Sequence, residues 1–191
     1  MTGSIGDPGK IGMPRLKMKI MVLTIYTLIH VAVSLAGIVT GVVVLLGLLT
    51  GKRFDSWTAL FLATTAATSV TGFFFPFHGL TPAIVTGIIS LLLLSVAAFA
   101  RYARRLARAW RQSYVINAVI VLYLNVFVLI AQAFQKIAAL KAFAPTQTEP
   151  PFKFAQIAVL AVFVFLTIVA AIKFREIPVR TIPGIPSRGS L

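Results

Sequence analysis

The chain has 191 residues, 59% of them hydrophobic, and carries a formal net charge of +14 from 18 basic and four acidic residues. Apolar runs near or above 18 residues with almost no charge indicate an integral membrane protein, and the basic residues lie at the ends of these runs, where they contact lipid headgroups rather than nucleic acid. The chain contains no cysteine, which excludes disulfides, thiolate metal sites and iron–sulfur clusters.

Five apolar segments predict an all-α, polytopic transmembrane bundle over residues 19–175, flanked by flexible tails at 1–18 and 176–191. The expected helices cover about 20–49, 56–75, 82–100, 113–138 and 152–174. The alternative is four spans, with the threonine-rich segment 56–75 re-entrant. The arginine-rich loop 101–112 is expected to be cytoplasmic, and the number of spans decides on which side the N-terminus lies.

The first helix carries polar and small side chains on one face, with His30 among them. This face predicts close packing against the next two helices, because small residues four apart let helix backbones approach in lipid. The predicted packing residues are Ser34, Gly37, Gly41, Ala63, Ala67, Gly72, Ala83 and Gly87. An imidazole at membrane depth is also a candidate ligand or proton-handling group, so both readings of His30 stay open.

The stretch "TGFFFPFHGLTP" at 71–82 separates the second and third segments. Pro76 prevents a regular helix from continuing, and Gly79 permits a positive φ. We therefore expect Pro76, His78 and Gly79 to form a turn at the membrane surface. The alternative is that His78 is a ligand.

The fourth segment places amides on one face. At 100° per residue, Asn117, Asn125 and Gln132 fall on one narrow stripe, together with Tyr114 and Gln135. An unpaired amide in hydrocarbon costs several kcal/mol, so the stripe must face protein, water or a ligand. Either the amides form interhelical hydrogen bonds, or they line a cavity for a haem edge, a quinone or a small solute.

Groups suited to catalysis are scarce, because the four acidic residues all lie outside the apolar runs. Paired carboxylates, a catalytic triad and a phosphate-binding glycine loop are not indicated. The sequence therefore leans towards a protein that is not an enzyme.

The stretches "TSVTGFFFPFHGLTP", "ARYARRLARAWR", "LYLNVFVLIAQAFQK" and "APTQTEPPF" resemble a group of uncharacterised polytopic inner-membrane proteins of alphaproteobacteria. The resemblance covers about residues 20–175. It implies a multi-pass protein of the bacterial inner membrane and supplies no activity, cofactor or site residue.

Two functions are left open by the sequence. The first is a non-enzymatic accessory, assembly or scaffold component that contacts the lipid bilayer and other membrane subunits, or a second copy of itself, without a cofactor. The second is a membrane protein that binds haem b, a quinone or a small solute through His30, Asn117, Asn125 and Gln132.

Overall fold

The computed structural model describes residues 8–75, 82–107 and 109–174. Six α-helices and one short π-helix make up this part of the chain: α1 (Pro8–Leu49), α2 (Asp55–Gly72), α3 (Pro82–Ala98), η1 (Phe99–Ala103), α4 (Ala109–Lys136), α5 (Ala138–Phe143) and α6 (Pro150–Lys173). The predicted all-α class is confirmed. The C-terminal tail predicted at 176–191 lies outside the described residues.

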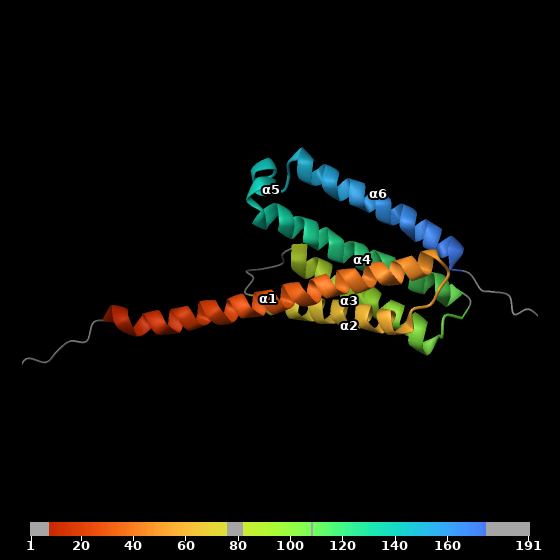
Figure 1. The fold of residues 1–191 in the computed structure, drawn as a ribbon, viewed down its shortest axis with the longest axis horizontal. Helices are drawn as coiled ribbons and strands as arrows, with labels where there is room; N and C mark the ends of the chain where they lie inside the picture. Colours follow the sequence, from red (N-terminus) through yellow and green to blue (C-terminus); the bar gives the residue numbers. More distant parts are fainter. Residues whose placement is uncertain (1–7, 76–81, 108, 175–191) are drawn as a thin grey trace, which may run out of the picture.

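The helices run side by side in an elongated bundle (Figure 1). α1 packs against α2, α4 and α6, while α3 packs against α2 and α4, and α6 lies mainly on α4. Successive long helices alternate in direction, so α1 ends at the same end of the bundle at which α2 begins, α3 leads into η1, and α6 ends. We call this end, which holds Lys52, Arg53, Arg101, Arg104 and Arg105, the basic end.

Within the part of the chain that the structure describes, four helical stretches are long and apolar enough to cross a membrane: Arg15–Leu49, Ala83–Ala103, Ala109–Lys136 and Pro150–Lys173. The predicted second span corresponds to α2, which is not among these four. Asp55 in its first turn and its many threonines make it less apolar. Four of the five predicted spans are thus supported, and a membrane crossing by α2 stays a prediction.

The helix boundaries differ from the predicted ones at three places. α1 begins at Pro8, so residues 8–18, expected in a flexible tail, are helical in the structure, in keeping with the good helix formers Arg, Leu, Lys and Met at 15–19. The predicted fourth helix is split, because Ile137 adopts an extended backbone between α4 and α5. The second helix begins at Asp55, with Phe54 in the N-cap position, and ends at Gly72 instead of the predicted 75.

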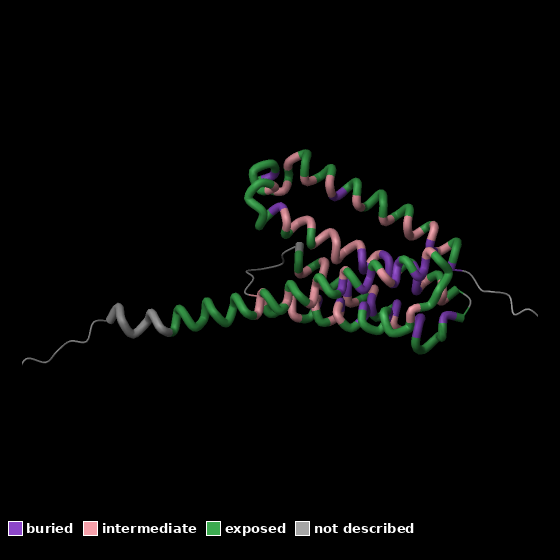
Figure 2. The backbone as a smooth tube through the Cα atoms, in the orientation of Figure 1, coloured by how far each residue is buried: buried purple, intermediate pink, exposed green. Residues whose placement is uncertain are grey.

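The buried core is concentrated towards the basic end. Val44, Leu45 and Leu48 of α1 belong to it, as do Phe61 of α2 and Leu122 of α4. Towards the opposite end α6 is mostly exposed, and α1 runs on alone beyond the other helices (Figure 2). Hence the basic end is the tightly packed part of the bundle and the part in which side-chain positions are best determined by their neighbours.

Candidate functional site: an arginine-lined pocket

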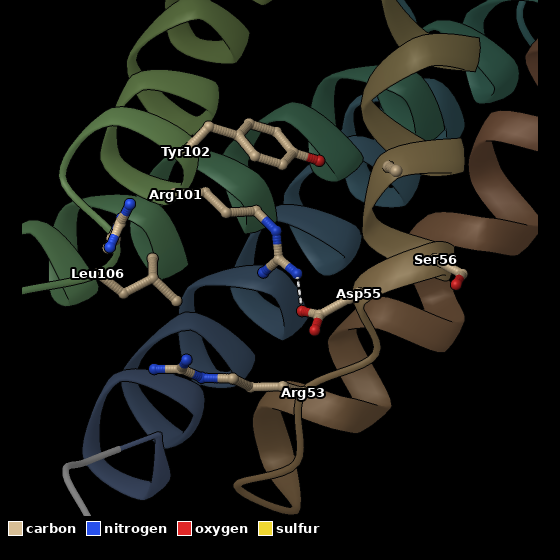
Figure 3. Close-up of a pocket in the computed structure, with 8 residues that line it drawn as sticks. Arg53, Asp55, Ser56, Arg101, Tyr102 and Leu106 are labelled. Atoms are coloured by element: carbon tan, nitrogen blue, oxygen red, sulfur yellow. Dashed lines mark hydrogen bonds and ion pairs between the residues drawn. The ribbon is translucent and has the colours of Figure 1, made fainter.

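An open pocket of about 450 Å³ lies at the basic end, between the start of α2 and η1 (Figure 3). It is lined by Arg53, Asp55, Ser56, Ala59, Arg101, Tyr102, Arg105 and Leu106. Three arginines and a single carboxylate thus line the pocket. A pocket with this excess of fixed positive charge favours an anion.

Arg101 is the most deeply placed of these cations. Its side chain is 8% exposed, and its Nη2 donates to Oδ1 of Asp55, whose own side chain is 79% exposed. Figure 3 shows the Arg101 guanidinium directed at the Asp55 carboxylate, with the Arg53 side chain extending away from it. The ion pair joins η1 to the first turn of α2, and it leaves the outer side of the carboxylate open to the pocket.

Two tyrosine rings flank the Arg101 guanidinium, the buried Tyr114 from the protein side and the exposed Tyr102 at the pocket. Its Cζ lies 5.4 Å from the ring centroid of Tyr114 on α4 and 5.8 Å from that of Tyr102. The Tyr114 hydroxyl donates to Oγ1 of Thr58 on α2 at 3.3 Å, so the ring itself is fixed. These contacts compensate for part of the cost of burying a guanidinium, because a cation over an aromatic face is attracted to it.

The loop after η1 has an unusual backbone. Arg105 has a φ of +48° and Leu106 a φ of +58°, both in the left-handed region that residues other than glycine seldom occupy. Leu106 is 3% exposed, and its backbone N–H donates to the carbonyl of Ala100 at 3.0 Å. Burial of Leu106 thus holds the loop in this conformation and keeps Arg105 in the pocket lining.

Sequence reasoning missed this pocket. It took the arginines of 101–112 only as charges that orient the chain and gave Asp55 no role beyond being one of the four acids outside the apolar runs. The single acidic residue beside Arg53 and ahead of an apolar run was the available signal, since an acid at a membrane border needs a nearby cation.

The predicted cofactor residues do not form a common site. His30 Nδ1 pairs with Oγ1 of Thr71 at 2.8 Å, and its ring packs edge-on against Phe75. Asn125 Nδ2 instead donates to Oγ1 of Thr65 at 3.2 Å. Thr65 and Thr71 are six residues apart on α2, about 9 Å along its axis, so His30 and Asn125 serve separate contacts.

The other two amides are also dispersed. Asn117 Nδ2 donates to the carbonyl of Ser113 one turn earlier on α4, at 2.7 Å. Gln132 is exposed. Within residues 8–75, 82–107 and 109–174, no three His, Asp or Glu side chains are grouped to hold a metal ion. Asn125 of the predicted stripe thus makes a helix-packing contact, and ligand binding by His30, Asn117, Asn125 and Gln132 stays a prediction.

Two glycines of α1 lie close to neighbouring helices, Gly37 to α2 and Gly41 to α2 and α4. An added Cβ at Gly41 would lie 2.6 Å from Leu122 Cδ1 and 2.8 Å from Phe61 Cε2, so this glycine is required by close approach. Gly72 faces His30 Cε1, and Gly87 faces Phe73. By contrast, Ala63, Ala67 and Ala83 are exposed, and Ser34 donates to the carbonyl of His30 within its own helix. The predicted turn residues Pro76, His78 and Gly79 lie outside the described residues.

A second ordered polar region is the loop between α5 and α6. Glu149 accepts hydrogen bonds from the hydroxyl and backbone N–H of Thr146 and from the backbone N–H of Thr148. Desolvation raises the pKa of Glu149, but these hydrogen bonds together outweigh it and hold the pKa below its ordinary value. Gln147 bridges back to α4 by donating to the carbonyl of Ala131 at 2.6 Å.

Comparison of the chain with known protein families, with curated proteins and with solved structures found no match. The sequence and the structure support a multi-pass helical membrane protein in contact with a lipid bilayer.

Proposed function

We propose that the protein is a non-enzymatic accessory or assembly component of a complex in a bacterial inner membrane, and that α1 is the element that contacts its partner. The observation that carries this proposal is the exposure of the N-terminal part of α1. Residues 15–25, which we call the α1 arm, are all exposed in the chain by itself (Figure 2).

The length of α1 explains why the arm is exposed. Forty-two residues make a helix about 63 Å long, twice the roughly 30 Å of a hydrocarbon core. The last contacts with α2 are made near Tyr26, whose hydroxyl donates to the Thr71 carbonyl. The arm then continues past the end of α2 with exposed apolar side chains at Ile20, Met21, Val22, Leu23 and Ile25.

The charge of the arm favours a different protein over a second copy of this chain. Arg15, Lys17 and Lys19 are all cationic, and the arm contains no acidic residue. Two arms packed in parallel would bring these like charges together. The fitting occupant is a membrane protein that offers an apolar helix face beside residues 20–25 and acidic groups beside residues 15–19.

The described acidic residues support the non-enzymatic part of the proposal. Asp55 is paired with Arg101, and Glu149 is taken up by hydrogen bonds within its loop. Both carboxylates are thus engaged in interactions within the fold, which favours a structural role for them over general acid–base catalysis.

The absence of cysteine makes the partner test direct, because a single introduced thiol has no competitor in the chain. We would place Val22→Cys in the arm and Phe165→Cys on α6 as the matched control, since the native side chains are 59% and 64% exposed. Both full-length variants would be treated with a thiol crosslinker in the native membrane. We expect the arm variant alone to give an adduct with one other membrane protein, identified by mass spectrometry.

Charge reversal then separates a specific partner from a chance neighbour. Lys17→Glu combined with Lys19→Glu should abolish that adduct. An adduct of twice the chain mass would show self-association, and equal adducts from both variants or none from either would also contradict the proposal.

A further inference from the structure

We propose that the arginine-lined pocket at the basic end binds a phosphate group, supplied by an anionic lipid headgroup or by free phosphate. This inference concerns the opposite end of the bundle from the α1 arm, so it does not depend on the partner proposed there. It assigns a ligand class to a site that neither helix packing nor membrane topology requires.

The pocket's charge is the first argument. Arg53, Arg101 and Arg105 face it with one carboxylate, Asp55, so the lining has two uncompensated positive charges. Free phosphate carries roughly −1.5 to −2 at neutral pH and the phosphodiester of an anionic lipid carries a single negative charge, and guanidinium groups match the oxygens of both through paired N–H donors. The charges of host and guest are therefore complementary.

The second argument is that one side of the pocket is built rigidly. Arg101 is fixed by the Asp55 carboxylate and by the faces of Tyr102 and Tyr114, and cannot swing into solvent as surface arginines do. A cation fixed in this way loses less conformational entropy when an anion binds.

The third argument is the strained backbone at Arg105. Two successive non-glycine residues with positive φ cost of order 1–3 kcal/mol each, and such strain persists where the surroundings enforce it and often marks a functional site. Here the buried Leu106 side chain enforces it. This conformation places Arg105 in the lining as the third arginine of the pocket.

The depth of the pocket fits a headgroup as the source of phosphate. It lies where the stretch Ala83–Ala103, which is apolar enough to cross a membrane, comes to its end. Phe99, Tyr102 and Trp57 are exposed nearby, as expected of aromatic residues at the membrane interface. A lipid phosphate would thus be at the level of the guanidinium groups.

The test compares arginines inside the pocket with cations just outside it. Arg53→Gln and Arg105→Gln remove lining charges, while Lys52→Gln and Arg104→Gln remove the same charge from the neighbouring residues, which do not line the pocket. Non-specific attraction to an anionic surface is about 1 kcal/mol per basic residue and would fall equally in all four variants. High salt screens that attraction between exposed charges and leaves a held phosphate in place.

Full-length protein would be reconstituted in phosphatidylcholine vesicles with and without phosphatidylglycerol, and separately titrated with inorganic phosphate, with thermal unfolding and retained lipid as readouts at high salt. We expect each pocket variant to weaken the protective ligand by about tenfold and each control by no more than about twofold. If phosphatidylglycerol protects the protein from thermal unfolding and added phosphate does not displace the lipid, the ligand is the lipid headgroup. If phosphate protects the protein in vesicles of pure phosphatidylcholine, the ligand is the free ion. Lack of protection by both, or equal weakening in pocket and control variants, would overturn the proposal.

Discussion

Arg101 and Asp55, 46 positions apart in the chain, form an ion pair in which the guanidinium is buried and the carboxylate is largely exposed. This asymmetry means that the pair is held by the arginine's surroundings, Tyr102 and Tyr114 among them, and is open on the side of the acid. It ties the start of α2 to the end of the α3–η1 segment.

Removing the carboxylate should leave Arg101 buried without an anionic partner. We expect Asp55→Asn to lower the free energy of unfolding by about 1–2 kcal/mol, less than the loss for a fully buried pair because water reaches one side. Thermal unfolding in a neutral detergent would measure it. Glu149→Gln is the matched carboxylate-to-amide control and should leave global unfolding unchanged; an equal unfolding temperature for both variants would show that Arg101 does not need Asp55.

Replacing Gly37 or Gly41, which lie four residues apart on α1, by alanine should change the stability of the protein in opposite directions. Gly41→Ala places a Cβ 2.6 Å from Leu122 Cδ1 and should lower the free energy of unfolding by about 1–3 kcal/mol. Gly37→Ala meets Thr64 Oγ1 and Thr65 Oγ1 at 3.4 Å, and its gain in helix propensity should keep stability near or above wild type. Thermal unfolding of the two variants side by side measures the difference, and similar losses at both positions would contradict it.

His30 should behave as a packing and hydrogen-bonding residue. Because its Nδ1 is paired with Thr71 Oγ1, we expect His30→Ala and Thr71→Val each to lower the free energy of unfolding by about 0.6–1.7 kcal/mol. The double variant should lose less than the sum of the two, since each single change already breaks the same bond. A reduced-minus-oxidised haem spectrum in the purified wild-type protein that disappears in His30→Ala would contradict this role.

The loop before α6 should loosen in acid. The hydrogen bonds from Thr146 and Thr148 depress the pKa of Glu149 in the folded loop. The stabilisation of the loop by the ionised Glu149 carboxylate is therefore fully present above the ordinary glutamate pKa of about 4.3. That contribution is lost as the pH falls from there through the lower folded-state value. The protection of the amides of residues 146–149 against hydrogen exchange, relative to the intrinsic rate at each pH, should therefore fall over that range in wild type. The Glu149→Gln variant should show fast exchange already at neutral pH, and a loop equally protected in both proteins would refute the assignment.

The apolar helices were predictable because a bilayer imposes a length and a composition on each of them. Arg15–Leu49 and Pro150–Lys173 stand out by those two properties alone. The second segment is harder, since Asp55 and the threonines of α2 lower its hydropathy, while the hydroxyls of Thr58 and Thr65 find hydrogen-bond partners within the bundle. The hydropathy of one segment carries no information about hydrogen-bond partners on other helices.

The amide stripe shows the limit of helical periodicity. The angles place Asn117 and Asn125 on one face of α4, but only Asn125 lies opposite a hydroxyl on α2, whereas Asn117 bonds within its own helix. Which of the two meets a neighbour depends on the axial position of α2 along α4. Periodicity fixes the direction of a side chain and carries no information about that offset.

The sequence alone determined that this chain is a helical membrane protein with a close-packed α1–α2 face, because hydrophobic run length and small-residue spacing are local properties with direct physical consequences. Only the tertiary structure decided that Arg53, Asp55, Arg101 and Arg105 share one pocket and that the α1 arm extends past its neighbours. Those relationships join residues that are far apart in the chain or depend on where other helices end, and they arise from packing between helices rather than from any segment's own pattern.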